Sequence, residues 1–147
     1  MPLNREWQSR IKAVEREYLA MRQAADRFRE TALADPTILL EDLRHRDIVE
    51  ASRNLEGTYL MRLFAEFETG ARQYWETNWD TNPKTVDLLN GLAARCGIPD
   101  TPRDHGHLVR DYRNSLVHER EDATAAVPIA VARGYLSRFF SFLPQRW

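Results

Sequence analysis

Apolar residues recur through the first part of the chain at alternating steps of four and three positions, which places them on one face of an α-helix. We expect Asn4 to be the N-cap, because its side chain can accept a hydrogen bond from a first-turn N–H group. The helix should end before Asp35 and Pro36, since proline lacks an N–H donor and disfavours helical geometry in the preceding residue. The apolar face of this long helix consists of Trp7, Ile11, Val14, Tyr18, Met21, Ala25, Phe28 and Ala32.

A second helical period begins near Ile48, after a connector that runs from Thr37 to Leu43, and continues toward Asn78. Gly57 is a candidate break in this helix, because glycine is a poor helix former. Turn formers and a proline in residues 78–83 predict a loop after it. The positions on its inner face are Ile48, Ser52, Leu55, Tyr59, Leu60, Leu63, Phe64, Phe67, Ala71, Tyr74 and Trp75.

Three shorter helices complete the predicted fold. The first runs from Thr85 to Cys96 and ends at a glycine and proline stop in residues 97–99. The next runs from about Pro102 to about Glu119, and Pro128 can occupy the first turn of the last one. The expected core positions are Leu108, Tyr112 and Leu116 in the former helix, and Val131, Tyr135, Leu136, Phe139, Phe140 and Leu143 in the latter.

No segment shows the strict alternation of a half-buried strand, and the chain contains no internal repeat or linker that would divide it. The pattern therefore predicts an all-α fold, an antiparallel bundle of about four to five helices. We expect residues 1–147 to form a single domain.

The composition indicates in which compartment this helical bundle is expected. A chain of 147 residues with 43% hydrophobic content is large enough to bury a core without a metal or a disulfide. Its single cysteine, Cys96, cannot form an intrachain disulfide, which fits a reducing compartment. The N-terminus lacks the features of a signal peptide, and no run approaches the roughly 18 apolar residues of a membrane span. We therefore expect a cytoplasmic protein with no membrane partner.

Because the net charge of the chain is close to zero, any contact with nucleic acid must depend on a local group of basic residues. The net charge of −1 comes from 21 basic and 22 acidic residues spread along the chain, so nothing global attracts a phosphate polymer. One stretch concentrates titratable chemistry, because three of the four histidines lie there among arginines. Its members are Arg103, His105, His107, Arg110, Arg113, His118 and Arg120.

Helical geometry distributes these side chains unevenly. Arg110, Asn114 and His118 share one stripe of an ideal helix, whereas Arg113 lies roughly 140° round from His118. Arg113 and His118 could converge through the reach of the arginine, a helix end near His118 or a second subunit. The alternative is a solvated helix face with a capping histidine.

The string Arg113-Asn114-Ser115-Leu116-Val117-His118 resembles the signature of the HEPN superfamily, an arginine followed by a polar residue and, after four to six intervening positions, a histidine. Here four residues intervene and the polar residue is Asn114. The resemblance implies a small helical bundle that carries the motif late in the chain, with one further helix after it. It also implies metal-independent RNA cleavage at a composite site in a homodimer, commonly in toxin and antitoxin pairs, phage defence or RNA processing.

These side chains suit that chemistry. RNA carries its own nucleophile, the 2′-hydroxyl, so the protein needs only to move protons and stabilise negative charge on phosphorus. His118 would move the protons, Arg113 would hold the nonbridging oxygens, and Asn114 would orient the imidazole or the phosphate. The expected products are a 2′,3′-cyclic phosphate and a 5′-hydroxyl, formed without a cofactor or metal. The expected RNA-binding residues are Arg110, Arg120 and His107.

Other interpretations stay open at this point. The same fold could serve as a non-catalytic module that binds RNA or protein, or as a helical partner in a regulatory complex with no RNA role. His105 and His107 with His118 could form a metal site, although this spacing suits a strand better than a helix. Acidic residues could pair with the arginines or stay in water, and the candidates are Glu66, Glu68 and Asp111. For Trp75 we favour a core position over stacking on a base, and we expect His45 to be solvated at the start of the second helix.

Overall fold

The computed structural model of the protein describes residues 3–118 and 124–147. Helices make up most of this part, which contains no strand, and an isolated bridge joins Leu3 to Arg146. The elements are α1 (Asn4–Ala34), the short 3-10 helix η1 (Pro36–Ile38), α2 (His45–Asn78), α3 (Thr85–Cys96), α4 (Asp100–His118) and α5 (Ile129–Ser141). The prediction of an all-α helical bundle is confirmed.

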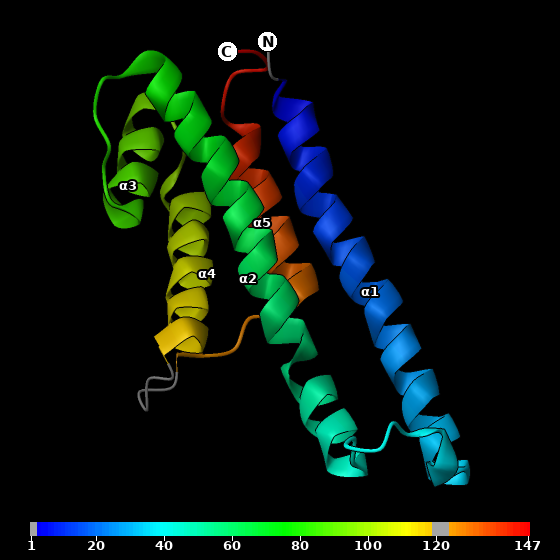
Figure 1. The fold of residues 1–147 in the computed structure, drawn as a ribbon. Helices are drawn as coiled ribbons and strands as arrows, with labels where there is room; N and C mark the ends of the chain where they lie inside the picture. Colours follow the sequence, from blue (N-terminus) through cyan, green and yellow to red (C-terminus); the bar gives the residue numbers. More distant parts are fainter. Residues whose placement is uncertain (1–2, 119–123) are drawn as a thin grey trace.

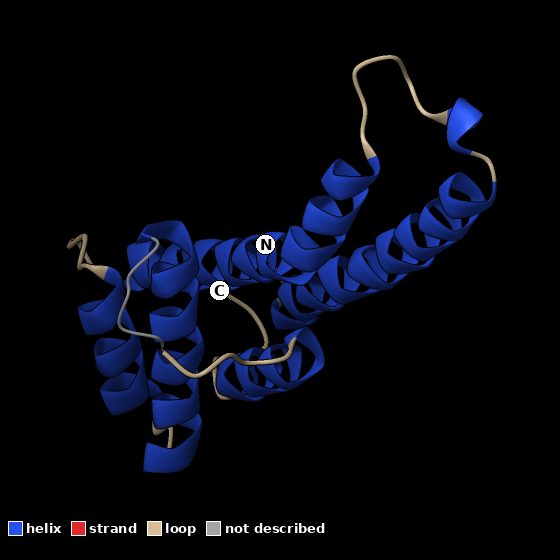
Figure 2. Ribbon diagram, turned by 90° about the horizontal axis from the view of Figure 1, so that it is seen from below, coloured by secondary structure: helices blue, strands red, loops and turns tan. Residues whose placement is uncertain are grey.

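The two longest helices, α1 and α2, run antiparallel and form the backbone of the bundle (Figure 1). Helix α5 packs against both of them, α4 packs against α2 and α5, and α3 lies outermost against α4 and α2. The far ends of α1 and α2, joined through η1, project beyond the other helices as a two-helix arm (Figure 2). At the opposite end, the start of α1 meets the last residues of the chain, where the Asn4 N–H donates to the Gln145 carbonyl at 3.0 Å.

Aromatic side chains from α1, α2 and α5 fill the centre of the bundle. Phe67 is fully buried, with its ring centroid 5.4 Å from that of Phe139 and 6.2 Å from that of Phe140, both edge-on. Gly70 permits this close packing, because a Cβ there would lie 2.7 Å from Trp7 and 3.0 Å from Phe140. The glycine therefore sets how closely α1 and α5 approach α2. None of the helices in the described ranges is both long and apolar enough to cross a membrane.

The predicted helix boundaries agree closely with the structure. Helix α3 has the predicted ends, and Gly97 adopts the left-handed conformation, at φ 66°, that stops it. Helix α4 starts two residues before Pro102, and the predicted end at Glu119 lies outside the described residues. The candidate break at Gly57 is wrong, since α2 continues through it. The glycine packs beneath Leu116, whose Cδ2 would lie 3.4 Å from a Cβ at that position.

Four of the predicted core residues are exposed, because tertiary packing decides which positions of each helix are covered. Leu108 is 43% exposed, and the buried residues of α4 are Pro102, Gly106 and Val109. Helix α4 thus turns a neighbouring stripe toward α5, where Gly106 lets the Phe139 ring come close. Met21 and Phe28 are 45% and 40% exposed, because that half of α1 lies on the projecting arm. Val131 of α5 is exposed as well, whereas the core position of Trp75 is confirmed.

The predicted N-cap at Asn4 is also wrong. Leu3 is the N-cap, and Asn4 is the first residue of α1 and completely buried. Its Nδ2 donates to the carbonyls of Phe140 and Leu143, both at 2.9 Å, and to that of Pro144 at 3.3 Å. One amide therefore ties the start of α1 to the last turn of α5 and to the residues that follow it.

Replacing Asn4 with Ala should lower the free energy of unfolding by about 2 kcal/mol, because buried carbonyl oxygens lose their donor. Urea unfolding followed by circular dichroism measures the change. Asn78→Ala is the matched control, since Asn78 is exposed and donates only to the Tyr74 carbonyl one turn earlier. Equal effects of the two substitutions would contradict the role given to Asn4.

Candidate functional site

Arg113 reaches from α4 across to α2. Its Nη2 donates to Glu68 Oε2 at 3.1 Å, and its guanidinium lies over the Phe64 ring, 4.7 Å from the centroid. The two charged side chains are 24% and 21% exposed, so solvent screens this pair less than a fully exposed one. The ring beneath and the carboxylate beside it together set the orientation of the guanidinium plane.

Glu68 is the hub of this site. Its Oε1 accepts from Arg72 Nη2 at 2.9 Å, from Arg72 Nε at 3.1 Å and from the Thr85 hydroxyl at 2.8 Å. Arg72 in turn donates from Nη1 to the Pro83 carbonyl at 2.8 Å, which ties the loop before α3 to α2. Two guanidinium groups thus share one carboxylate, which leaves this cluster, Arg72, Glu68 and Arg113, with one net positive charge.

A small cavity opens beside the cluster, between α2 and the last turns of α4. Its volume is about 250 Å³. The lining residues are Met61, Phe64, Ala65, Glu68, Arg113 and Val117. Arg113 therefore borders an accessible space.

His118 is the last residue of α4, and its side chain is exposed. Asn114, one turn earlier, is half-buried. Among the described residues no hydrogen bond joins Arg113 to His118, as the wide angle between them on the helix predicts. A single chain therefore presents the two motif residues separately, Arg113 against α2 and His118 at the helix end.

The expected RNA-binding residues Arg110 and His107 do come together. Arg110 Nη1 lies 2.9 Å from His107 Nδ1, and His107 Nε2 lies 2.7 Å from Asn90 Oδ1 of α3. A guanidinium only donates, so Nδ1 accepts and Nε2 carries the proton that it donates to Asn90. Arg110 also pairs with Asp111 at 2.7 Å. Arg120, the third expected residue, lies outside the described residues.

Burial, followed by the nearby Arg110 charge, lowers the pKa of His107 below its ordinary value of 6.5. The neutral ring is the form that can accept from Arg110 and donate to Asn90 at the same time. His107 therefore acts as an uncharged link between α3 and α4.

The side chain of His105 contacts α5 rather than α3. The His105 ring stacks on the Tyr135 ring of α5, with centroids 3.8 Å apart and an angle of 13° between the planes. His105 and His107 thus contact different helices, α5 and α3. In the described ranges no group of three or more His, Cys, Asp or Glu side chains could hold a metal ion.

Sequence reasoning left the arginine partners open, and tertiary structure decides them. Glu68 is the partner of Arg113, and Asp111 is that of Arg110. Nothing in the sequence singled out Arg72 or Thr85, because they lie in α2 and α3, outside the stretch that concentrates histidine and arginine. The spacing of Glu68 and Arg72, four positions apart in a helix, was the one available signal.

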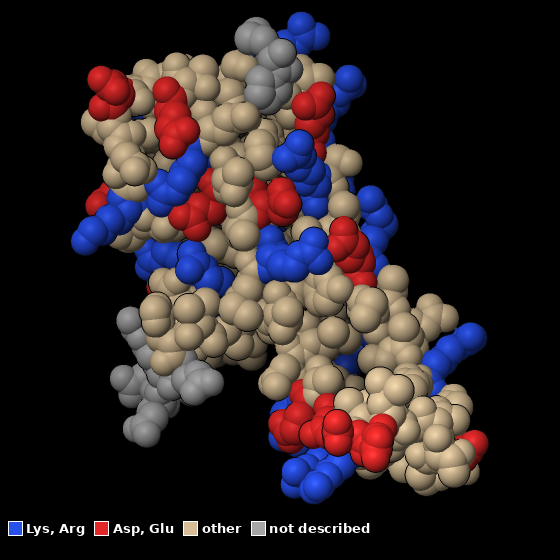
Figure 3. Space-filling model, in the orientation of Figure 1, with Lys and Arg blue, Asp and Glu red and all other residues tan. Residues whose placement is uncertain are grey.

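Charged groups of both signs are interspersed over the face of the molecule seen in Figure 3. This mixture is in keeping with the net charge of −1. Comparisons with protein-family models, with curated proteins and with solved structures find no significant match to this chain.

Glu68→Gln should destabilise the fold by about 2 kcal/mol, because charge-assisted bonds to two arginines are lost and an amide N–H₂ faces their donors. Chemical unfolding measures the change. The control is Glu50→Gln, whose partner Arg53 and own side chain are 68% and 56% exposed, so that its loss should cost less than about 1 kcal/mol. A Glu68 variant as stable as the control would show that the cluster does not hold α4 to α2.

Stability should fall as the pH drops through the lowered pKa of His107. The folded-state pKa lies below the unfolded one, so the unfolded chain binds more protons in this range and protonation favours unfolding. The contribution is complete above pH 6.5 and is lost below it. His107→Gln keeps a donor and an acceptor without titrating, and should flatten this part of the profile. Unfolding measured from pH 7.5 to about 5 would refute the assignment if both proteins lost stability equally.

Proposed function

We propose that the protein is a metal-independent endoribonuclease of the HEPN kind, active as a homodimer, with Arg113 and His118 as its catalytic residues. The observation that carries the proposal is the placement of Arg113. Its guanidinium is oriented by Glu68 and Phe64 at the border of a cavity, on the helix whose exposed end bears His118. The position of this helix before one last packed helix agrees with the resemblance of the motif.

Arg113 would bind the phosphate that reacts. Its Nη2 is committed to Glu68, and the guanidinium has further N–H donors in the same plane for nonbridging oxygens. The net positive charge of the Glu68 cluster would stabilise negative charge as it builds up on phosphorus. Glu68 is then a positioning residue, since it acts through Arg113.

His118 would transfer the protons. The 2′-hydroxyl must lose a proton and the leaving 5′-oxygen must gain one, so the reaction benefits from a base and an acid. One chain has one such histidine in the motif, and a twofold axis near the exposed end of α4 would supply the second. Asn114 would orient the imidazole or the phosphate, and Arg110, Arg120 and His107 remain the predicted RNA contacts.

A role follows from this chemistry. Free RNA cleavage is harmful in a cell, so an endoribonuclease of this kind suits a cytoplasmic toxin or phage-defence protein of a prokaryote, controlled by a cognate antitoxin protein. The substrate is RNA, because the mechanism uses the 2′-hydroxyl as its nucleophile.

The second candidate is a non-catalytic module of the same fold that binds RNA or protein. It is favoured by the ion pairs of the site, because Arg113 and Arg110 are already compensated within the chain by Glu68 and Asp111. A module of this kind would retain RNA without cutting it.

Purified protein should cut single-stranded RNA in EDTA and leave 2′,3′-cyclic phosphate ends. His118→Ala and Arg113→Ala should each slow cleavage at least about 100-fold, since each removes a group that acts in the transition state. Denaturing gels of end-labelled RNA measure the rates. His45→Ala and Arg103→Ala are matched controls, one on the arm and one at the far end of α4, and both should cut at the wild-type rate.

Mixing wild-type protein with an excess of His118→Ala tests the composite site. A heterodimer would carry a single His118 and would lack either the base or the acid, so the mixture should lose more activity than dilution of the wild-type protein explains. Sedimentation at the same concentration should show a dimer. Cleavage that survives both substitutions would refute the catalytic roles of Arg113 and His118. A strict monomer that cuts RNA would refute the composite site. RNA retention without cutting would favour the second candidate.

A further inference from the structure

The exposed apolar side chains of this protein are concentrated on the two-helix arm. In the part of the chain that the structure describes, eleven large hydrophobic residues are exposed, and seven of them lie between residues 19 and 43. The most exposed of all, at 78%, is Leu40 in the segment that joins η1 to α2. The seven residues are Leu19, Met21, Phe28, Leu33, Ile38, Leu40 and Leu43. Because a large exposed apolar surface commonly marks a place of interaction, the arm is a candidate contact surface.

Charge is distributed unevenly along the arm. Its free end, residues 35–43, contains three acidic residues and no basic one. Its helical stem, residues 19–34 and 44–53, contains six arginines and four acidic residues. A second arm that lay antiparallel would place its acidic end against this basic stem, whereas a parallel arm would bring the two acidic ends together. The charge pattern therefore favours a second copy of the same chain, in antiparallel orientation.

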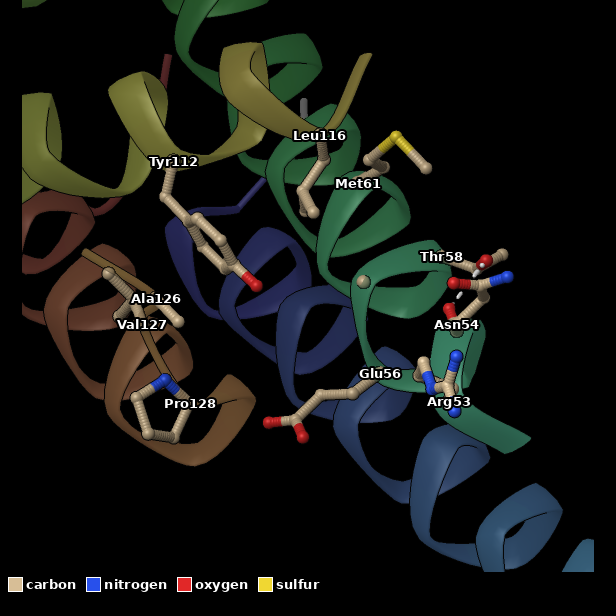
Figure 4. Close-up of a pocket in the computed structure, with 11 residues that line it drawn as sticks. Arg53, Asn54, Glu56, Thr58, Met61, Tyr112, Leu116, Ala126, Val127 and Pro128 are labelled. Atoms are coloured by element: carbon tan, nitrogen blue, oxygen red, sulfur yellow. Dashed lines mark hydrogen bonds between the residues drawn. The ribbon is translucent and has the colours of Figure 1, made fainter. Parts of the chain in front are cut away.

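A cavity with a volume of about 490 Å³ lies at the base of the arm, where α2, the end of α4 and the segment before α5 meet (Figure 4). Tyr112 and Leu116 of α4 supply aromatic and aliphatic surface to its wall. Arg53 of the stem also lines the cavity, and its side chain is 68% exposed. Met61 lines both this cavity and the smaller one beside Arg113. The larger cavity thus combines apolar surface with a cation near its opening.

Glu56 limits how deeply a charged group can enter this cavity. Its side chain points into the space from α2 (Figure 4), where Oε1 accepts from the Ile129 N–H at 2.9 Å and Oε2 accepts from the Tyr18 hydroxyl at 3.4 Å. The carboxylate is held in place by these bonds, and its negative charge repels other carboxylates. An acidic segment can therefore place an apolar side chain inside the cavity only if its own carboxylates stay at the opening, beside Arg53.

We propose that this cavity receives the free end of the arm of a second copy of the chain. Leu40 of the partner subunit would enter the cavity beside Tyr112. Glu41 and Asp42 of the partner subunit would stay at the opening and pair with Arg53. One twofold axis makes this contact twice, because each arm has both the inserting end and the receiving base. The inference rests on the proposed function for the homodimer, and it identifies the surface that holds the two copies together.

The contact is compatible with the proposed role of His118. The arm and the exposed end of α4 leave the bundle on the same side (Figure 1). Leu116, two residues before His118, lines the receiving cavity. Two copies joined by antiparallel arms would therefore have the exposed ends of their α4 helices on the sides that face each other. The second copy would lie where the proposed mechanism requires it.

Substitutions on the two sides of the contact test it. Leu40→Ser removes the inserting side chain, which is so exposed that a single chain loses little packing. Arg53→Glu reverses the charge at the opening and breaks only an exposed ion pair within the chain. Glu41→Arg combined with Asp42→Arg reverses the charge of the arm's free end. Val86→Ser is the matched control, since Val86 is 39% exposed but lies on α3, away from the arm.

Sedimentation equilibrium of the full chain measures the dissociation constant of the dimer, and circular dichroism checks the fold of each variant. Leu40→Ser, Arg53→Glu and the reversed free end should each raise the dissociation constant at least about tenfold, while Val86→Ser should not change it. Combining the charge reversals on both sides in one chain should restore most of the affinity, because opposite charges then face each other again. Damage to the fold would not be repaired in this way.

The outcomes separate this inference from the proposed function when RNA cleavage is measured on the same samples. A wild-type chain that stays monomeric at about 100 μM overturns the arm contact. So does a dimer that the arm variants do not weaken, or that Val86→Ser weakens as much, or that the combined reversals do not restore. If such a protein cuts RNA, the endoribonuclease stands without the arm contact. A dimer that depends on the arm and cuts no RNA supports the contact and overturns the endoribonuclease.

Discussion

The contact of Phe67 with the two phenylalanines of α5 is the constraint from which the other placements follow. Phe67 is fully buried, and Gly70, one turn along, lets Trp7 of α1 and Phe140 of α5 come within contact distance. Because α2 is a continuous helix, fixing it at this point also fixes the direction of every side chain further along it. Glu68, the residue after Phe67, is thereby turned toward α3 and α4 and becomes available to Arg113.

The Glu68 carboxylate shows how a nearly neutral protein builds a local positive site. The whole chain has a net charge of −1, yet two guanidinium groups and one carboxylate share a partly buried place between α2, α3 and α4. The carboxylate offsets part of the repulsion between the arginines and holds both in fixed orientations. An oriented guanidinium with residual positive charge is the element that phosphate chemistry needs, and here α2 contributes as much to it as the motif helix does.

Different faces of α4 contact different helices. Gly106 and His105 pack on α5, and the neutral His107 contacts α3. The last turns of α4 lie over α2, where two neighbouring cavities share Met61 as a lining residue. The exposed end bears His118. This arrangement explains why one chain keeps Arg113 and His118 apart, and why a second copy at that end is a physical requirement of the proposed mechanism.

The amino-acid sequence by itself determined the helices, because periodic apolar spacing, the proline at 36 and the glycine at 97 are local signals that need no partner. It also determined which stretch carries titratable chemistry. Only the tertiary structure decided which stripe of α4 is buried, that Asn4 serves the end of α5 rather than the start of α1, and that Glu68 rather than Glu66 holds Arg113. All three outcomes depend on contacts between residues far apart in the sequence, 45 positions for Arg113 with Glu68 and 139 for Asn4 with Leu143, and helical periodicity carries no information about which distant side chain lies opposite.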